Sequence, residues 1–250
     1  MNKRERDSQT KPSNKFNKRL KKENNSVPFS FINYWRMYKT KGIKLPLYYF
    51  FQAHLFDLIN GTDTHKWLPK KYIENEVANF EHVGIYMASW TSEVKKIFKK
   101  LNYILGSDFE KYTFIDIGCG KGKVGIIWNI LCKNYCKKQS IFGVDLLEEL
   151  IVIAENNHLK ILGSKGKYLA QDVTKINPTE FGNKFILYLY NPFDDFILGK
   201  MLEKFEKYET LIVYNNPVYS DFLLGNGYSI LFEHNGFHGN LHTIGFTNKS

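Results

Sequence analysis

Apolar residues follow two different patterns along the chain, and the pattern changes near residue 110. Before this point, Leu47, Phe51, Leu55 and Leu58 have the three- and four-residue spacing of one helix face, and a second run with this spacing follows Thr91. After it, short β-rich runs alternate with helical stretches of about ten to fourteen residues. This alternation predicts an α/β fold in which crossover helices connect the strands of a parallel sheet.

The second part of the chain contains seven predicted strands and three clear helices. We expect strands over residues 113–117, 141–144, 167–171, 185–190, 211–214, 228–233 and 241–246, and helices over about 121–132, 147–158 and 197–205. The fourth strand is an unbroken apolar run, which is typical of a strand covered on both faces. A Gly-containing loop joins the last two strands, so we expect them to form an antiparallel hairpin.

Charge and composition divide the chain into three predicted regions. Residues 1–27 form a predicted disordered basic tail, residues 28–108 a helical N-terminal cap, and residues 109–250 the main α/β domain. Residues 1–25 hold nine basic and three acidic residues, so they carry +6 of the net +10. The remainder has a single arginine, Arg36, and we therefore expect at most weak contact with nucleic acid, through the tail.

Cysteine and apolar content predict a cytoplasmic protein that does not insert into a membrane. The three cysteines form no paired framework, and the richest apolar run outside the strands, 45–59, is too short and too polar to span a bilayer. The aromatic residues of the cap, including Trp35 and Tyr48 to Phe51, suggest two hypotheses. They form a membrane-surface face, or, as we favour, they pack as core over the sheet edge or the substrate.

A glycine-rich sequence lies where the first predicted strand passes into a helix. It includes Asp116, Gly118, Cys119, Gly120 and Gly122. Ligands of open α/β sheets bind outside the carboxyl ends of the strands, where glycines allow sharp bends and close approach. The helix that follows offers unpaired N–H groups to a carboxylate or phosphate. This sequence is therefore a candidate cofactor loop.

Two further carboxylates end the next two strands. Asp145 follows Gly122 by 23 residues and is suited to accept hydrogen bonds from both hydroxyls of an adenosine ribose. Asp172 ends the third strand and is suited to accept one from an adenine amino group. Dinucleotide sites use G-x-G-x-x-G, whereas this loop has G-x-G-x-G with Asp116 before it. That acid disfavours a pyrophosphate and suits a cationic amino-acid group.

These residues resemble the class I S-adenosylmethionine-dependent methyltransferases over about residues 112–246. The loop at 116–122 is similar to the family's first motif, Asp145 to its ribose-binding acid, and Asp172 with Val173 to its adenine contact. The resemblance implies S-adenosyl-L-methionine as cofactor, no metal, and a Rossmann-like seven-stranded sheet with helices on both faces and a terminal antiparallel hairpin.

The end of the fourth strand, Asn191-Pro192-Phe193, resembles the Asn-Pro-Pro-aromatic motif of amino methyltransferases, with one proline fewer. The resemblance implies that Asn191 and a following carbonyl accept hydrogen bonds from the amine, while the ring packs on the substrate. A strand-terminating turn is the alternative, because Asn-Pro also favours turns and recurs at Asn216. The chain also resembles, more loosely, uncharacterised bacterial methyltransferases. The similar residues are Lys121, which follows the second motif glycine, and the sequence around Asp57 and 61–64.

Two other residue groups contain side chains that bind metals in other proteins. His234, His238 and His242 recur every four residues, but the intervening glycines disfavour a helix and hence a metal site. Cys132 and Cys136 are predicted to pack in the core from one helix face.

The sequence therefore predicts a methyltransferase acting on a nucleophile, with an amine nitrogen favoured. The acceptor is left open among protein lysine, nucleic-acid base and small molecule, and the oligomeric state is not predicted. An NAD(P)-dependent Rossmann oxidoreductase and a noncatalytic nucleic-acid-binding module are the alternatives.

Overall fold

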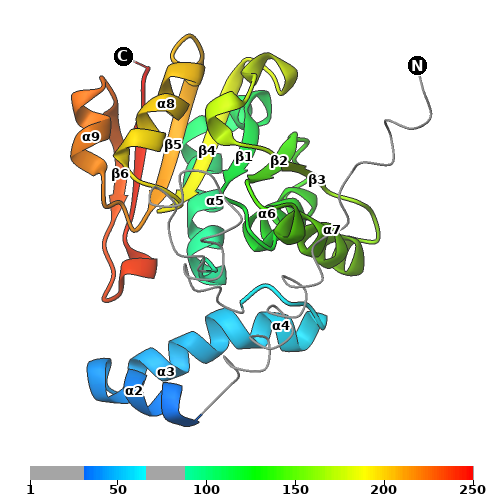
Figure 1. Cartoon of the computed structure of the whole chain (residues 1–250), viewed down its shortest axis with the longest axis vertical. Coiled ribbons are helices and arrows are strands. Elements are labelled where there is room, and N and C mark those ends of the chain that lie inside the picture. Colours follow the sequence, from blue (N-terminus) through cyan, green and yellow to red (C-terminus); the bar gives the residue numbers. More distant parts are fainter. Residues whose placement is uncertain (1–30, 66–87, 250) are drawn as a thin grey trace.

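The computed structural model describes residues 31–65 and 88–249, and the described part contains a seven-stranded sheet with helices on both faces (Figure 1). The strand order is β3-β2-β1-β4-β5-β7-β6. The strands are β1 (Thr113–Ile117), β2 (Ile141–Asp145), β3 (Lys167–Ala170), β4 (Lys184–Tyr190), β5 (Glu209–Asn215), β6 (Ser229–His234) and β7 (Thr243–Thr247).

Strand pairing confirms the predicted α/β, Rossmann-like fold class. β1 pairs in parallel with β2 on one side and β4 on the other, and β3 and β5 extend the parallel part outward. β7 pairs antiparallel with both β5 and β6, which confirms the predicted terminal hairpin. The carboxyl ends of β1 to β5 therefore lie along one edge of the sheet.

Helices cover the sheet in two layers. One face packs against α5, α6 and α7, and the other against α8 and α9. The bounds are α5 (Thr91–Leu105), η4 (Gly106–Lys111), α6 (Lys123–Asn134), α7 (Glu148–Leu162), η5 (Val173–Lys175), η6 (Pro178–Glu180), α8 (Asp195–Phe205), α9 (Ser220–Gly225) and η7 (Gly239–Leu241).

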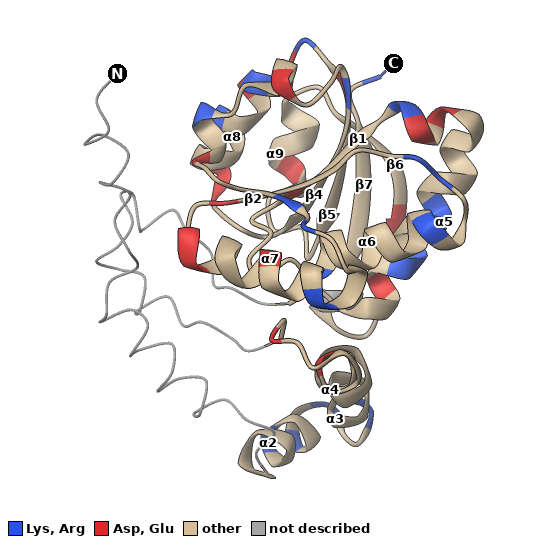
Figure 2. Cartoon of the chain, turned by 90° about the vertical axis from the view of Figure 1, so that its right-hand side faces the viewer, with Lys and Arg blue, Asp and Glu red and all other residues tan. Residues whose placement is uncertain are grey.

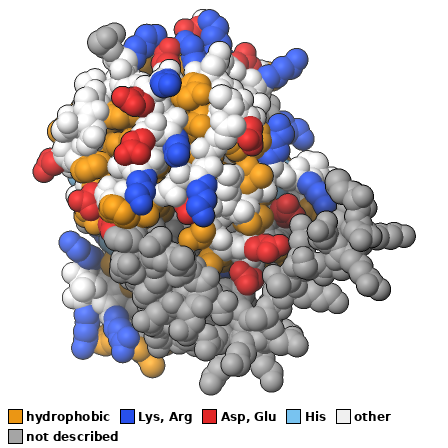
Figure 3. All heavy atoms as spheres, turned by 45° about the horizontal axis from the view of Figure 1, so that its top comes forward, with side chains coloured by type: hydrophobic (Ala, Val, Ile, Leu, Met, Phe, Trp, Pro, Cys, Tyr) orange, Lys and Arg blue, Asp and Glu red, His pale blue; other side chains and the backbone are white. Residues whose placement is uncertain are grey.

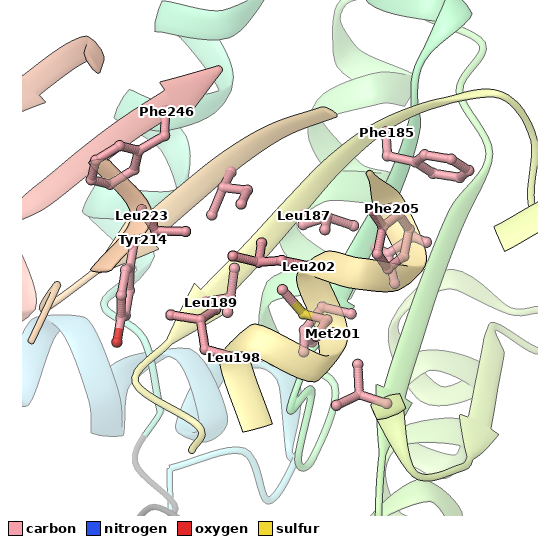
Figure 4. Close-up of a cluster of buried hydrophobic side chains, with 14 of the residues drawn as sticks. Phe185, Leu187, Leu189, Leu198, Met201, Leu202, Phe205, Tyr214, Leu223 and Phe246 are labelled. Atoms are coloured by element: carbon pink, nitrogen blue, oxygen red, sulfur yellow. The ribbon is translucent and has the colours of Figure 1, made fainter. Parts of the chain in front are cut away.

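The alternation within each strand explains why both layers are needed. In β4, Phe185, Leu187 and Leu189 pack toward α8, where Figure 4 shows them facing its apolar side chains. Ile186 and Tyr188 point the other way, into the cluster formed with α5 and α6. Because both faces are buried, the strand reads as a continuous apolar run.

Predicted and observed element ends differ by one or two residues for most strands. β4 and β5 extend to the polar residues Lys184 and Asn215, because the backbone ladder continues beyond the apolar run. The helix predicted from residue 121 begins at Lys123, since Gly122 is its left-handed N-cap. The short helix α9 was not predicted.

The N-terminal segment, residues 31–65, is helical as predicted and lies beyond the carboxyl ends of the strands (Figures 1 and 2). It consists of α2 (Phe31–Lys41), α3 (Lys44–Tyr49), the π-helical turn η1 (Phe50–His54) and α4 (Leu55–Asn60). The predicted tail 1–27 and two parts of the predicted cap, 28–30 and 66–87, lie outside the described residues, and the proposed division of the chain stays a prediction.

The helix face marked by apolar spacing in this segment is largely exposed. Leu47, Phe51 and Leu58 are 50%, 55% and 67% exposed, whereas Leu55 is half-buried. The prediction that the cap aromatics pack as core is wrong for Trp35, which is 48% exposed, while Tyr48 stacks on the buried Trp90 with ring centroids 5.9 Å apart. The side that reaches the sheet instead buries Ala53, His54 and Asp57. Polar contacts with the loop after α4, described below, compensate the burial of Asp57.

The predicted core position of Cys136 is also wrong, whereas Cys132 is buried as predicted. α6 ends at Asn134, and Cys136 has a φ of 52° and is exposed. The N–H of Lys137 donates to the carbonyl of Cys132, and the N–H of Cys136 to that of Lys133. These two bonds form a Schellman motif, which turns the chain away from the helix axis before residue 136.

Surface charges are mixed on the edge opposite the N-terminal segment. Figure 3 shows acidic, basic and apolar side chains interspersed there. In the part of the chain that the structure describes, no helix is long and apolar enough to cross a membrane.

Candidate functional site

The sheet order brings the predicted site residues to one edge. β3, β2, β1 and β4 are neighbours in that order, so the segments after their carboxyl ends lie side by side. Gly118 follows β1 and contacts Pro192, which follows β4: a Cβ on Gly118 would lie 2.6 Å from the Pro192 Cβ. The predicted cofactor loop and the predicted acceptor motif are therefore adjacent.

The glycine loop depends on backbone conformations that L-residues rarely adopt. Gly118, Gly120 and Gly122 have φ values of 70°, 51° and 81°. A Cβ on Gly122 would lie 2.9 Å from the Ala154 Cβ, so this glycine also permits close packing of α7. The loop turns sharply over the end of β1 and leads into the N-terminus of α6, as the sequence predicted.

Cys119 contributes its backbone rather than its thiol to this loop. Its N–H donates to the Val144 carbonyl, while its side chain packs with Ile151, Ala154 and Tyr168. Burial, followed by the nearby carboxylates, raises the pKa of the thiol, so it is neutral and buried beneath the loop.

Asp116 is a buried carboxyl group beside the loop. It is 3% exposed, and the Gly125 N–H donates to its carboxylate. Among the described residues, its Oδ2 atom has no hydrogen-bond partner. Burial, and then repulsion from Asp145, raise its pKa to about 8. A cationic ligand group would relieve both effects.

Asp145 connects the end of β2 to the glycine loop. Its Oδ2 accepts a hydrogen bond from the Gly120 N–H at 2.8 Å, and its Oδ1 accepts one from the Leu147 N–H at 3.0 Å. Burial raises the pKa of this carboxyl, although these N–H groups oppose the rise. A carboxylate has about four acceptor sites, so the group is able to accept hydrogen bonds from a ligand at the sites that these N–H groups leave open.

Asp172 and Val173 follow β3, and both take part in local structure. The Asp172 Oδ1 caps η5 by accepting hydrogen bonds from the Thr174 N–H at 2.9 Å and the Thr174 hydroxyl at 2.8 Å. The Val173 side chain is buried in the core cluster on the α8 face. Contact with a ligand would therefore use the Asp172 Oδ2 or the backbone, and the adenine role stays a prediction.

Asn191 directly follows β4 and has a conformation that requires support, since its φ is 45°. The Tyr214 hydroxyl, from the end of β5, donates to its Oδ1 at 3.2 Å. Phe193 packs partly against the core cluster that includes Leu198 of α8. The sequence did not predict Tyr214 as part of this site, because a tyrosine near the end of an apolar strand is indistinguishable from a core residue.

The N-terminal segment also reaches this edge. Lys121, in the glycine loop, and Lys123, the first residue of α6, are 1% and 2% exposed. The Lys121 ammonium donates to Asp63 at 3.1 Å, and the Lys123 ammonium to the Gln52 carbonyl at 2.6 Å. Burial lowers the pKa of Lys123 to about 8. In the sequence, Asp63 and Lys121 stand out only through the looser family resemblance, which predicts no contact between them.

The three evenly spaced histidines, His234, His238 and His242, have separate environments. His238 stacks on Trp90, with ring centroids 5.1 Å apart, and His242 lies 3.4 Å from Glu233. Within residues 31–65 and 88–249, no group of three or more His, Cys, Asp or Glu side chains is arranged to hold a metal ion.

Comparisons with known proteins give structural likenesses only. No family model matches the chain, and no curated protein matches it. Among solved structures, it is similar to magnesium protoporphyrin IX methyltransferase from Synechocystis PCC 6803 with bound SAM, at 15% identity and a TM-score of 0.47, covering 64% of this chain and 79% of that one. A SAM-dependent methyltransferase from Aquifex aeolicus has 17% identity and a TM-score of 0.42, with coverage of 63% and 96%.

A ribosomal protein L11 methylase from Lactobacillus delbrueckii subsp. bulgaricus has 14% identity and a TM-score of 0.42, with coverage of 63% and 77%. At such identities and TM-scores, the fold assignment rests on the strand order of this chain itself.

Proposed function

We propose that this chain is an S-adenosylmethionine-dependent methyltransferase whose acceptor atom is an amine nitrogen. One observation carries the proposal: the glycine loop, with the buried carboxyl of Asp116 and the half-buried carboxyl of Asp145, lies against the turn that contains Asn191 and Pro192. A methyl donor and a methyl acceptor must be adjacent for direct transfer, and these two elements are in contact.

The residues present fit the cofactor. The orphaned Oδ2 of Asp116 suits the ammonium group of the methionine moiety, directly or through water. Asp145 retains the lone pairs needed to accept hydrogen bonds from the ribose hydroxyls. When bound, S-adenosylmethionine supplies an electrophilic methyl group on a sulfonium.

The protein's contribution to the chemistry is mainly alignment. The acceptor lone pair forms the N–C bond as the C–S bond breaks, and the amine proton leaves to solvent, so no covalent protein intermediate is needed. We infer that the Asn191 Oδ1 accepts an amine N–H and orients the lone pair. The Tyr214 hydroxyl holds that same oxygen in place. Alignment of this kind contributes effective molarities of about 10⁵ M or more.

Two alternative functions predict different ligands. A nicotinamide-dependent oxidoreductase would bind a pyrophosphate beside the glycine loop, where the Asp145 carboxylate repels it and where Asp116, with its raised pKa, supplies no cation to balance its charge. A noncatalytic nucleic-acid module would depend on the basic tail, and its binding would weaken steeply with salt. Thermal-shift measurements with S-adenosylhomocysteine and NADH distinguish the oxidoreductase from the methyltransferase, because each is stabilised by its own ligand. Deletion of residues 1–27, with a salt titration of RNA or DNA binding, separates the second.

The direct test is calorimetric binding of S-adenosylhomocysteine to the protein and to Asp145→Ala. We expect the substitution to weaken binding by about 1–3 kcal/mol, because it removes charge-assisted hydrogen bonds. Asp108→Asn is the control, since Asp108 lies on η4, before the amino end of β1, and pairs there with the exposed Lys111. Unchanged affinity in Asp145→Ala would remove this residue from the binding site.

The acceptor class is identified by transfer of label. The protein is incubated with a cell lysate and methyl-labelled cofactor, and protein, nucleic-acid and metabolite fractions are then separated. We expect label on an amine nitrogen in one fraction, and label on oxygen or carbon would contradict the proposed role of Asn191.

A further inference from the structure

The loop after α4, Gly61–His65, is shaped by the carboxylate of Asp57. This carboxylate accepts hydrogen bonds from the Thr62 hydroxyl at 2.6 Å, the Thr64 N–H at 2.9 Å and the His65 N–H at 2.9 Å. The His65 imidazole also contacts it. Burial acts to raise the pKa of Asp57, but these hydrogen bonds outweigh burial and lower it to about 2. The loop therefore has a defined shape, built around an ionised carboxylate.

Asp63, at the centre of this loop, pairs with a residue of the glycine loop. The Lys121 ammonium donates to the Asp63 Oδ2 at 3.1 Å. The Lys121 side chain is 1% exposed, whereas that of Asp63 is 26% exposed. Lys121 also lies just before the N-terminus of α6, where the helix dipole disfavours a cation. A buried ammonium in this position needs an anionic neighbour, and the N-terminal segment provides one.

Asn157 of α7 joins the two loops a second time. Its Nδ2 donates to the Asp63 carbonyl and to the Lys121 carbonyl, both at 3.1 Å, and its Oδ1 accepts from the Asp63 N–H at 3.2 Å. Both amide hydrogens and the amide oxygen are thus engaged. Asn157 is 5% exposed, so these bonds are shielded from water.

The contacts constrain a segment that is otherwise free to rearrange. Lys121 lies between Gly120 and Gly122, two left-handed glycines whose backbones have many accessible conformations when unconstrained. Holding both the carbonyl and the ammonium of Lys121 restricts the whole turn. A binding loop that is ordered before its ligand arrives loses less entropy on binding.

We propose that Asp63 and Asn157 are positioning residues, which act through Lys121 to hold the glycine loop in its binding conformation. The N-terminal segment is then part of the cofactor site, although it adds no direct ligand. The part of this inference that concerns cofactor affinity rests on the proposed function. The part that concerns loop order does not.

The test compares Asp63→Asn, Lys121→Met, the double variant and the control Asp108→Asn with the unmodified protein. Asp63→Asn preserves the size of the side chain and its backbone bonds to Asn157 but removes the carboxylate near the ammonium. We expect at least about tenfold weaker calorimetric binding of S-adenosylhomocysteine in Asp63→Asn. The double variant is expected to bind better than Asp63→Asn, because Met no longer buries a charge. The control is expected to match the unmodified protein.

Hydrogen exchange of the loop amides, measured without ligand, provides the second readout. We expect faster exchange at Gly118–Gly122 in Asp63→Asn than in the control. Unchanged exchange would overturn the proposal. Faster exchange with unchanged affinity would also overturn it. Tighter binding of S-adenosylhomocysteine in Asp63→Asn would overturn it too, because it would mean that Lys121 contacts the cofactor directly. Failure of the unmodified protein to bind S-adenosylhomocysteine would refute the proposed function, while hydrogen exchange would still test whether Asp63 orders the glycine loop. If Asp63→Asn does not fold, Lys121→Met is measured in the same two ways, with the same expected directions.

Discussion

Binding of S-adenosylhomocysteine at pH 7 is expected to release nearly one proton, and Asp116 is its source. Burial and the neighbouring Asp145 raise the pKa of Asp116 to about 8. At pH 7 a group with this pKa is about 0.9 protonated, so the free protein holds Asp116 mainly as the neutral acid. A bound ammonium group beside the orphaned Oδ2 favours the carboxylate.

Whether Asp116 loses its proton depends on two free energies, the cost of ionising it and its attraction to the bound ammonium group. Ionising a carboxyl of pKa about 8 at pH 7 costs about 1.4 kcal/mol, since one pH unit is worth about 1.36 kcal/mol. An ammonium about 4 Å away contributes about 4 kcal/mol at an effective dielectric constant of about 20. The attraction exceeds the cost, so Asp116 ionises in the complex. Affinity therefore rises with pH, by about 50-fold between pH 6 and pH 8.

The assay is calorimetry in three buffers with different ionisation enthalpies. The dependence of the observed enthalpy on that of the buffer gives the number of protons released. We expect about 0.9 proton per site for the unmodified protein and close to none for Asp116→Asn. Asp116→Asn is also expected to flatten the pH dependence of affinity between pH 6 and pH 8. If the variant still releases nearly one proton, the titrating group is another, and our account of Asp116 is refuted.

Three further substitutions test the site and the loop that supports it. Gly118→Ala is expected to lower the free energy of unfolding by about 2 kcal/mol or more in urea titrations, because its Cβ meets Pro192 at 2.6 Å and its φ is 70°. Asn191→Ala is expected to reduce turnover while calorimetric affinity for S-adenosylhomocysteine is unchanged, and full turnover would exclude its orienting role. Asp57, with its pKa lowered from 3.8 to about 2, contributes about 2–3 kcal/mol of stability that is present above pH 4 and is lost as the pH falls toward 2. Asp57→Asn is expected to remove most of this acid dependence, as measured by urea unfolding at pH 7 and pH 3.

The sheet could be predicted from sequence because its signal is local. Each central strand is buried on both faces, so its apolar run marks it directly, as at 185–190. The strand ends then identify which polar residues share an edge, and Asp116, Asp145 and Asn191 were predicted together for that reason. The backbone conformation of each residue could not be predicted in this way. The left-handed φ of Asn191 depends on support from Tyr214 of another strand.

The N-terminal segment could not be predicted in the same detail, because distant partners determine which of its faces is buried. Apolar spacing marks the helix face of Leu47, Phe51 and Leu58, but these side chains are exposed, whereas Asp57 is buried. A buried aspartate is tolerated only where a loop satisfies it, and no local pattern indicates that loop. Likewise, a lysine between two glycines looks solvent-exposed, and the burial of Lys121 depends on a residue 58 positions earlier in the chain.

The contact between Gly118 and Pro192 couples two segments that are 74 positions apart in the chain. Neither residue is free to drift alone during evolution, since a larger side chain at the first position displaces the second. Natural relatives that have alanine or serine at the first position should therefore carry a smaller residue at the second, or a turn shifted away from it. Attempts to redesign acceptor preference by altering the asparagine-proline turn will meet the same constraint and will need compensating changes across the sheet edge.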